Sequence, residues 1–220
     1  MDRGEEDLPM QPTIMPLGDT GILVRFSDRL DDMANRQALA LAAWLEAEPI
    51  SGILEVVPSL VSVLVRYDPL KIGPVRLAGE ISLRIGKADQ DGRGGEHLVR
   101  VRFDGPDLDE VVRALGLERA AFVEAHNQFP LRVLTTGFAP GFVYCGFHPE
   151  TLVLPRRREV RPVVKAGSVL FAAGQTAIAA TDIPTGWHVI GETDFRNFDP
   201  ARERPTLMTA GDTIRFEAIA

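Results

Sequence analysis

The sequence has almost none of the residues that hold exported proteins together by covalent bonds. Cys145 is the only cysteine among 220 residues, so no disulfide can form within the chain. Disulfides belong to oxidising compartments, and their absence is consistent with a reducing one. The first thirteen residues are acidic and polar, without the basic start and apolar core of a signal peptide. We therefore expect a cytoplasmic protein.

Long apolar runs and phosphate-binding loops are also missing. No uninterrupted apolar run approaches the ~20 residues of a membrane-spanning helix. The basic residues are three lysines and 21 arginines, and no GxxxxGK[ST] loop is present. The net charge is −7, which disfavours nonspecific binding to nucleic acid. We expect a protein that binds neither membranes nor nucleic acids and holds no ATP in a P-loop of its own.

Signatures of metal sites and serine nucleophiles are weak. Cys145 and His148 are close in sequence but have no second pair of ligands, and the other histidines are dispersed. Ser168 follows a glycine in a predicted turn, and the sequence has no G-x-S-x-G elbow. The residues therefore predict no metal site and no serine hydrolase.

The composition that remains is that of a folded protein with one division. Hydrophobic residues make up 45% and charged residues 25%, as in ordinary globular domains. The polar, glycine-rich segment 87–96 has the composition of a linker. We predict a disordered acidic tail at 1–15, one domain at 16–86 and a second domain at 97–220.

The first domain has a mixed helix and strand pattern. Residues 20–26 alternate as a half-buried strand, and two further strands are predicted at 53–57 and 60–66, on either side of a turn at Pro58 and Ser59. A helix is predicted at 31–48, and a second helix begins at Pro74. The apolar face of the first helix is formed by Met33, Ala38, Leu41, Ala42 and Leu45. This order of elements favours an α+β domain of the ferredoxin-like kind.

The second domain changes to short apolar runs separated by glycine and proline. A strand is predicted at 97–103, followed by two short helices, the first capped by Asp107 with Glu110 and ended by Gly116. From residue 131 onward, closely spaced short strands predict a closed barrel or a sandwich. The runs are LRVLTTGF, TLVLP, SVLFAAG, TAIAATD, WHVIGET and DTIRFEAI.

Three aromatic side chains in segment 135–150 are candidates for the apolar wall of a binding site. Two Gly-Phe pairs flank Pro140, and the glycines would let the backbone approach a ligand closely. Phe138, Phe142 and Tyr144 would supply the wall. The alternative is a tight barrel corner with buried aromatic rings.

Arginines dominate the segment that follows. Arg156, Arg157, Arg158 and Arg161 lie within six positions of one another, and arginine forks bind carboxylates and phosphates in two-pronged geometry. Gln175 offers an amide that can both donate and accept. A solvated basic loop and a glutamine that only forms a turn are the alternatives. The residues alone thus favour a site for a small anionic or amide-containing molecule.

Two histidines are candidates for acid–base chemistry. His188 is adjacent to Trp187, and on a strand these two side chains would face opposite sides. His126 lies near a predicted helix end, where a structural role is the alternative. A histidine at either position could act as a general acid or base near neutral pH.

The motifs taken together resemble the family of 5-oxoprolinase B subunits, also known as allophanate hydrolase subunit 1 or the sporulation-kinase inhibitor family. GDTGILVRFSD, EVVPS and RYDPLK are similar to its N-terminal half. GFAPGFVY, LPRR, AGSVLFAAGQT, PTGWHVIGET and FDPARERPTLMTAGDTIRF follow in the family's order. The resemblance covers residues 16–219 and implies a ferredoxin-like domain followed by a cyclophilin-like β-barrel, which would be a carboxyltransferase-type domain.

The resemblance also implies an activity and partners. Family members pair with C and A subunits to form an ATP-dependent 5-oxoprolinase, which opens 5-oxo-L-proline to L-glutamate. The chain by itself would be inactive and would bind no cofactor, while the complex would use ATP. Arg156 and Gln175 stand at matching positions and suit a carboxylate and an amide.

Some positions depart from the family pattern and leave other substrates open. Ala179 and Ala180 stand where the family commonly has Tyr-Pro, and Lys165 and Thr185 replace a proline and a glycine. The loss of Tyr and Pro would alter a pocket wall. The alternatives are membership of a urea or amide carboxyltransferase or allophanate hydrolase-type complex, and a regulatory inhibitor of a histidine kinase.

Overall fold

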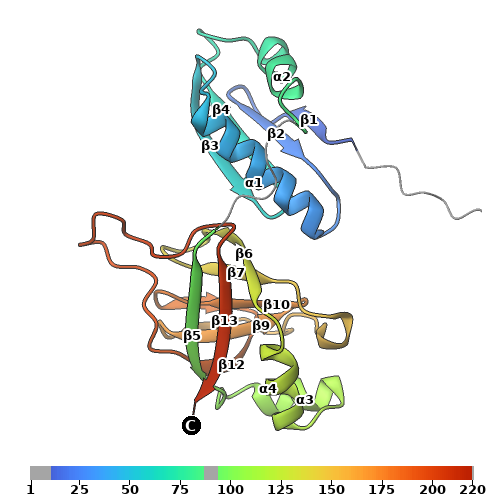
Figure 1. Cartoon of the computed structure of the whole chain (residues 1–220), viewed down its shortest axis with the longest axis vertical. Helices are drawn as coiled ribbons and strands as arrows, with labels where there is room; N and C mark the ends of the chain where they lie inside the picture. Colours follow the sequence, from blue (N-terminus) through green and yellow to red (C-terminus); the bar gives the residue numbers. More distant parts are fainter. Residues whose placement is uncertain (1–10, 87–93, 220) are drawn as a thin grey trace, which may run out of the picture. The chain divides into compact units, whose positions relative to one another are not determined.

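The chain folds as two compact units. The computed structural model describes residues 11–86 and 94–219, and the units are Met1–Gly92 and Arg93–Ala220 (Figure 1). The border between them falls inside the segment 87–96 that the sequence marks as a linker, of which 87–93 lies outside the described residues. None of the helices in the described parts is long and apolar enough to cross a membrane.

The first unit is a four-stranded antiparallel sheet with two helices. The sheet order is β1-β2-β4-β3. The predicted order of strand, helix, strand, strand and helix is found from β2 to α2, whereas the ferredoxin-like class remains a prediction. The elements are β1 (Thr13–Pro16), β2 (Gly21–Arg25), α1 (Asp32–Ala47), β3 (Ile53–Ser59), β4 (Ser62–Tyr67) and α2 (Pro74–Ser82).

Strand β1 shortens the predicted tail. The sequence assigned residues 1–15 to a disordered tail, but Thr13–Pro16 pair with β2, with Met15 opposite Leu23. Four residues that end in proline carry too little alternation to be recognised as a strand. Their edge position tolerates Pro16, since an edge strand needs hydrogen bonds on one side only. Residues 1–10 lie outside the described residues.

Helix α1 begins and ends where its sequence signals predict. The Asp31 carboxylate caps it by accepting from the backbone N–H of Ala34 at 2.7 Å. Ala38, Leu41, Ala42 and Leu45 are buried as predicted. Met33 is 55% exposed, so its assignment to the buried face was wrong. The buried face begins at the next residue, about 100° further around the helix.

The turn between β3 and β4 lies later than predicted. Pro58 and Ser59 belong to strand β3, and the turn is made at Leu60 and Val61, with Leu60 at φ 44°. Strand β3 is at the sheet edge, where the missing N–H of Pro58 costs no ladder bond. The proline signal for a turn was therefore overridden by an edge position that sequence does not reveal.

The second unit is a closed barrel whose strand order, within residues 94–219, is β10-β7-β6-β13-β5-β12-β9. Strands β13 and β5 run parallel, and the other pairs are antiparallel. Strands β8 and β11 form a separate two-stranded sheet. The elements are β5 (Glu96–Arg102), α3 (Leu108–Leu115), α4 (Arg119–Asn127), β6 (Leu131–Thr136), β7 (Val143–Gly146), η1 (Glu150–Leu152), β8 (Arg161–Val164), β9 (Ser168–Ala172), β10 (Gln175–Ile178), β11 (Ile183–Thr185), β12 (His188–Glu192) and β13 (Thr213–Ile219).

The barrel confirms the prediction of many short strands, with one exception. The run at 151–155 forms a single 3-10 turn, η1, and then irregular backbone rather than a strand. Leu152 and Leu154 are buried there because they pack on the barrel core. Their alternation with exposed residues mimicked a strand. The cyclophilin-like assignment of the barrel stays a prediction.

Strands β9 and β10 are buried on both faces. Val169, Phe171 and Ile178 point into the barrel, where they join side chains from all of its strands. Leu170, Ala172 and Ala177 point outward and are covered by a second apolar cluster that includes Ile183 of β11. This double burial explains why β9 and β10 read as continuous apolar runs.

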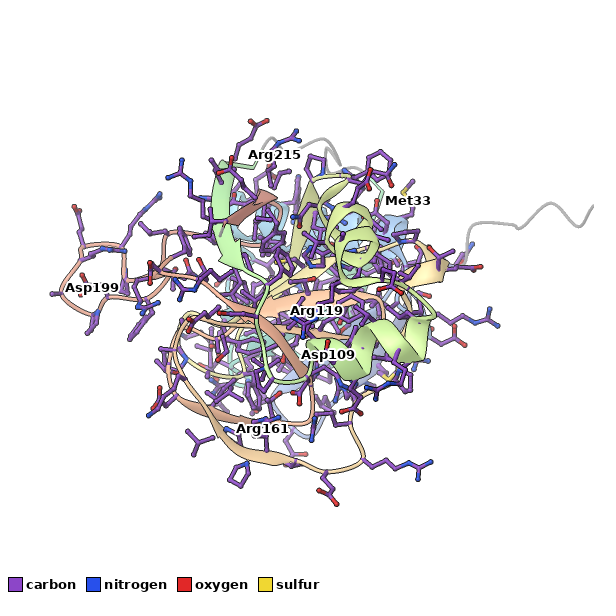
Figure 2. The ribbon with its side chains drawn as sticks, turned by 90° about the horizontal axis from the view of Figure 1, so that it is seen from below. Met33, Asp109, Arg119, Arg161, Asp199 and Arg215 are labelled. Atoms are coloured by element: carbon purple, nitrogen blue, oxygen red, sulfur yellow. The ribbon has the colours of Figure 1, made fainter. Side chains whose placement is uncertain are left out.

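Helices α3 and α4 lie together at one end of the barrel (Figure 1). Gly116 ends α3 in the left-handed conformation, at φ 69°, as predicted. Asp109 of α3 accepts from Arg119 of α4, an ion pair on the surface that is labelled in Figure 2. Asp107 occupies the N-cap position, but its side chain makes no cap hydrogen bond, so the predicted capping role was wrong.

Candidate functional site

A row of aromatic rings runs along the outer face of the barrel. The predicted wall residues Phe138, Phe142 and Tyr144 contact one another in sequence, with ring centroids 5.6 and 4.8 Å apart. The row continues to Trp187, whose ring centroid is 5.8 Å from that of Tyr144. At its end the Arg156 guanidinium lies over the Trp187 ring, 5.7 Å from the centroid. The structure therefore brings four of the predicted substrate-binding residues together.

The chain bends sharply to build this row. Gly137 and Phe138 have positive φ values of 129° and 74°, and Gly141 has one of 70°. A side chain on Gly141 would meet the Phe198 Cβ at 2.5 Å, so this position requires glycine. Phe138 is 70% exposed in a backbone conformation that bulky residues rarely adopt. Such an exposed ring on constrained backbone is suited to contact a ligand or a partner.

The polar groups of the row lie at the boundary between protein and solvent. Burial raises the pKa of the half-buried Tyr144 phenol, and the charge of Arg156 acts in the opposite direction. Tyr144 is thus neutral near pH 7 and can donate a hydrogen bond. A neutral donor beside a cation is a combination that binds carboxylates or other oxyanions.

Gln175 lies on the same barrel face as Tyr144. Ala177 pairs with Tyr144, and Gln175 is two residues earlier on β10, so both side chains point outward. Gln175 is 4% exposed, and its Nε2 has no hydrogen-bond partner in the described chain. A buried amide donor without a partner is costly, which marks a position where a ligand group or a water completes the bonding.

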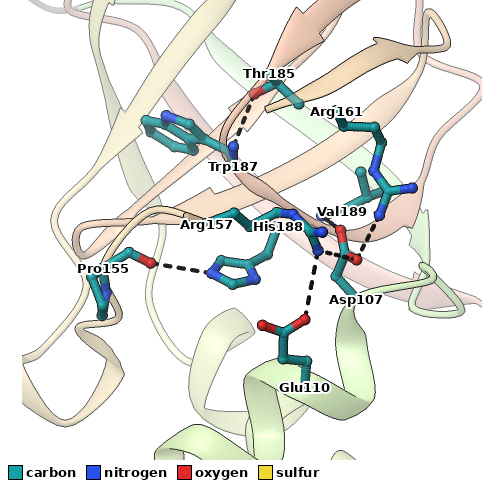
Figure 3. A network of polar contacts seen from close by, with 9 residues as sticks. All are labelled: Asp107, Glu110, Pro155, Arg157, Arg161, Thr185, Trp187, His188 and Val189. Carbon is teal, nitrogen blue, oxygen red and sulfur yellow. Dashed lines mark hydrogen bonds and ion pairs between the residues drawn. The ribbon is translucent and has the colours of Figure 1, made fainter. Parts of the chain in front are cut away.

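The arginine segment is fastened to the barrel rather than free in solvent (Figure 3). Asp107 Oδ1 accepts from Arg157 and from Arg161, each at 2.6 Å. The backbone N–H of Arg157 donates to Gly186 O at 2.7 Å. Asp107 is 4% exposed, and its other oxygen accepts from the Val189 N–H at 2.8 Å. The alternative of a solvated basic loop is therefore excluded for these two arginines.

Gly105 makes the position of Asp107 possible. Its backbone N–H donates to Ile190 O at 3.2 Å, and the Asp107 N–H donates to Val189 O at 3.1 Å. A Cβ on Gly105 would lie 2.3 Å from Val189 O, so only glycine allows this close approach to β12. The carboxylate that anchors the arginines thus depends on a backbone contact far away in sequence.

His188, the first residue of β12, is set apart from the aromatic row, whose Trp187 lies in the bend before the strand. Trp187 joins the outer cluster, whereas His188 lies beneath the arginine segment and its Nε2 contacts Pro155 O at 3.1 Å. A cleft of about 340 Å³ opens here between α3 and the arginine segment. Its lining includes Glu110 and Ala114 of α3, residues Leu154 to Glu159, and His188. Arg156 and His188 thus border the same cleft.

His126 belongs to a buried network inside the barrel. It is 1% exposed, and its Nε2 lies 2.8 Å from Thr176 Oγ1, which is also 2.8 Å from Nε2 of His148. Its Nδ1 lies 2.7 Å from Asn127 Oδ1. Burial lowers the pKa of His126 to about 4, and burial together with His126 lowers that of His148 to about 2. Both rings are neutral near pH 7, and the structure does not bring His126 together with Arg156.

Sequence reasoning missed several residues of these sites. Asp107 was interpreted as a helix cap, His148 was considered only as a metal ligand, and Thr176 was not a candidate. The i-to-i+3 spacing of Asp107 and Glu110 imitates a capping box, so no local signal separates an anchor from a cap. Trp187 was noted only as a neighbour of His188. Within residues 11–86 and 94–219, no group of three His, Cys, Asp or Glu side chains could hold a metal ion.

The comparisons with known proteins agree on one family. Residues 12–208 match the family described as carboxyltransferase domain, subdomain C and D. The chain is 30% identical over 222 residues to the 5-oxoprolinase B subunit of Bacillus subtilis, covering 94% of this chain and 92% of that protein. It is 32% identical to the 5-oxoprolinase B subunit of Haemophilus influenzae, covering 92% and 96%. The protein of the same name from Escherichia coli O157:H7 is 45% identical over 112 residues, about half of each chain.

Solved structures share the fold. The crystal structure of TTHA0988 superposes with a TM-score of 0.80 at 36% identity over 91% of this chain. This chain spans 40% of that one. The Kluyveromyces lactis urea amidolyase is similar in fold alone, with a TM-score of 0.77 at 18% identity. From the match over residues 12–208 and the two relatives aligned over nearly their whole length, this chain belongs to the carboxyltransferase domain, subdomain C and D family, together with proteins named as B subunits of 5-oxoprolinase.

Proposed function

We propose that this chain is the B subunit of a cytoplasmic, ATP-dependent 5-oxoprolinase complex that opens 5-oxo-L-proline to L-glutamate. The observation that carries the proposal is the alignment, over more than nine-tenths of each chain, with two proteins named as 5-oxoprolinase B subunits. A name that specifies one subunit implies companions, and we propose homologues of the C and A subunits as partners. Ferredoxin-like and cyclophilin-like folds for the two units belong to the same proposal.

The chemistry of the reaction suits a division between subunits. The lactam of 5-oxoproline is a poor electrophile, so its hydrolysis is coupled to ATP through a phosphorylated intermediate. This chain has no P-loop, and we assign ATP binding to a partner. The isolated chain would then bind no cofactor and would neither hydrolyse ATP nor open the ring.

The barrel face supplies groups that match the substrate. Arg156 would pair with the carboxylate, and Gln175 would bond the lactam amide. Phe138, Phe142 and Tyr144 would form a wall that excludes water and strengthens both polar contacts. His188, which borders the cleft beside Arg156, is our candidate for proton transfer. We leave His126 out of the site, because its ring is 1% exposed and its nitrogens are bonded within the barrel.

Reconstitution tests this proposal directly. The chain is coexpressed with the homologues of the A and C subunits from its own source, and the copurified complex is assayed for ATP-dependent formation of glutamate. We expect turnover by the complex and none by the chain alone. Robust turnover by the purified chain, or separate elution of the proteins at micromolar concentration, would contradict the proposal.

The family description favours a second candidate, membership of a urea or amide carboxyltransferase complex. Ala179 and Ala180, where the 5-oxoprolinase pattern commonly has Tyr-Pro, favour a different pocket wall. The same complex is therefore assayed with urea and with allophanate. Turnover of either, without turnover of 5-oxoproline, would select this candidate.

A further inference from the structure

The cleft between α3 and the arginine segment contains a buried group without a partner. His188 is 4% exposed, and its Nδ1 has no hydrogen bond in the described chain. Figure 3 shows this nitrogen on the side of the ring away from Pro155, and Glu110 lines the same cleft. A buried imidazole nitrogen without a partner costs free energy, so a ligand that supplies the bond is favoured there.

The hydrogen bond made by Nε2 determines whether Nδ1 lacks a donor or an acceptor. Nε2 lies 3.1 Å from Pro155 O, and a carbonyl oxygen can only accept, so Nε2 carries the proton. In a neutral ring Nδ1 is then an acceptor. The ligand must therefore bring its own O–H or N–H to this position.

The charges around the cleft favour an anion. Its lining includes Arg156, Arg157 and Arg158 against Glu110 and Glu159. Glu110 is itself paired with Arg157 at 3.5 Å. Arg156 and Arg158 make no ion pair with any residue of 11–86 or 94–219, so their charge is available. The Arg157 Nε, buried and without a partner in the described chain, is a further free donor.

We propose that this cleft binds a small oxyanion that keeps an O–H group at neutral pH, such as hydrogen phosphate or bicarbonate. The anionic oxygens pair with Arg158 and the Arg157 Nε, and the O–H donates to His188 Nδ1. Sulfate has the size and charge of phosphate but no O–H near pH 7, so it cannot complete the site. The inference goes beyond the proposed function and does not depend on 5-oxoproline as substrate.

Isothermal titration of the full-length chain at pH 7 tests the proposal with three probes: sodium phosphate, sodium sulfate and sodium bicarbonate. We expect phosphate or bicarbonate to bind at least about fivefold tighter than sulfate, the effect of one hydrogen bond. The tighter binder of phosphate and bicarbonate identifies which of these two anions the site prefers. Equal binding of all three, as an adventitious ion only, or no binding of any probe up to about 10 mM, would overturn the proposal.

Two substitutions of His188 separate the ligand role from a structural one. In His188→Gln the amide nitrogen reaches the position of Nε2 and keeps the bond to Pro155 O, but the acceptor at Nδ1 is lost. In His188→Asn the amide oxygen stands near the position of Nδ1, and the bond to Pro155 O is lost. We expect the first variant to lose the preference for phosphate over sulfate and the second to retain it. The opposite pattern, in variants with native circular dichroism, would show that His188 only holds the loop.

A matched pair of arginine variants tests the charge. Arg158→Gln should weaken phosphate and sulfate alike, about three- to tenfold, because it removes a cation without touching the O–H acceptor. Arg215→Gln, on the exposed side of β13 (Figure 2), should leave both affinities unchanged. Equal effects of the two variants would mean that only the overall charge attracts the anion, and the site would be wrong.

Discussion

The barrel holds a buried pair of histidines in its interior and a single histidine at its cleft, and the two places differ in how completely the hydrogen bonds of the rings are made. In the interior, His126 and His148 share the Thr176 hydroxyl, and His126 also contacts Asn127. At the cleft, His188 has one bond to Pro155 O and one buried nitrogen without a partner in the described chain. A buried network whose side chains hydrogen-bond to one another stabilises a core. A buried polar group without a hydrogen bond costs free energy unless a ligand or a water supplies the bond. The position of a histidine in sequence does not reveal this difference.

Removing the hydroxyl at the centre of the interior network should have the largest effect. Thr176→Val preserves shape but leaves two buried imidazole nitrogens without a bond. At about 1–3 kcal/mol each, the barrel should lose about 2–6 kcal/mol of unfolding free energy. Denaturant unfolding followed by circular dichroism measures this loss. Thr136→Val, at an exposed position of β6, is the control and should cost less than about 0.5 kcal/mol. Equal losses of unfolding free energy in the two variants would contradict the claim that the interior hydrogen-bond network stabilises the barrel.

Lowering the pH should also destabilise the barrel through its interior histidines, because their rings are buried in the neutral form. The folded pKa of His126 is depressed to about 4 from 6.5, so between these values the unfolded chain binds a proton that the folded chain does not. The stability that the neutral ring confers is therefore complete above pH 6.5 and falls as the pH drops toward 4. The loss from His126 alone is about 3 kcal/mol. Unfolding curves between pH 7 and 4 measure it.

A variant identifies the source of that pH dependence. In His126→Phe the slope between pH 6.5 and 4 should flatten relative to the parent, whatever the change in stability at pH 7. A slope unchanged by the substitution would assign the acid sensitivity to another group, above all His148, whose pKa is lowered from 6.5 to about 2. The Asp212 carboxylate, whose pKa is lowered by its backbone hydrogen bonds and by His97, acts only at lower pH, near and below its ordinary value of 3.8. Burial opposes that lowering.

At the outer site, changes should affect function more than stability. Arg156 is exposed and makes no ion pair within the described residues, so Arg156→Ala should leave unfolding nearly unchanged. The loss of a bond to a charged group costs about 1.5–3 kcal/mol, which lowers kcat/KM of the assembled complex roughly ten- to a hundredfold. Arg215→Ala is the matched control on β13. If both variants retain full activity, Arg156 does not contact the substrate.

The smallest effect is expected at Phe138. The ring is 70% exposed, so Phe138→Ala should change the unfolding free energy by less than about 0.5 kcal/mol. If the aromatic row lines the substrate site, KM of the complex should rise while kcat changes less. Weaker assembly of the complex instead, measured by light scattering, would assign the row to a partner interface.

Much of the fold follows from local patterns. Asp31, the periodic apolar residues and Pro49 locate α1, and Gly116 ends α3, because caps and breakers act within a few residues. The change from mixed helices and strands to short strands near residue 96 locates the second unit. The prediction was wrong where the sheet position decides the outcome. Pro58 lies within a strand because β3 is at the edge, and Leu152 and Leu154 are buried without forming a strand.

The candidate site residues also divide into those that the sequence predicted and those that only the structure identified. Sequence by itself selected Phe138, Phe142, Tyr144 and Arg156, because aromatic rings beside glycines can form an apolar wall and clustered arginines can bind an anion. The structure brings all four to one face. The sequence also predicted that Trp187 and His188 would face opposite sides if both were on a strand, but Trp187 lies in the bend before β12. Only the tertiary structure decided that Asp107 anchors two arginines and that His126 is enclosed while His188 has a free nitrogen among the described residues. These depend on which groups meet across more than 30 residues of chain, and no local pattern encodes such a meeting.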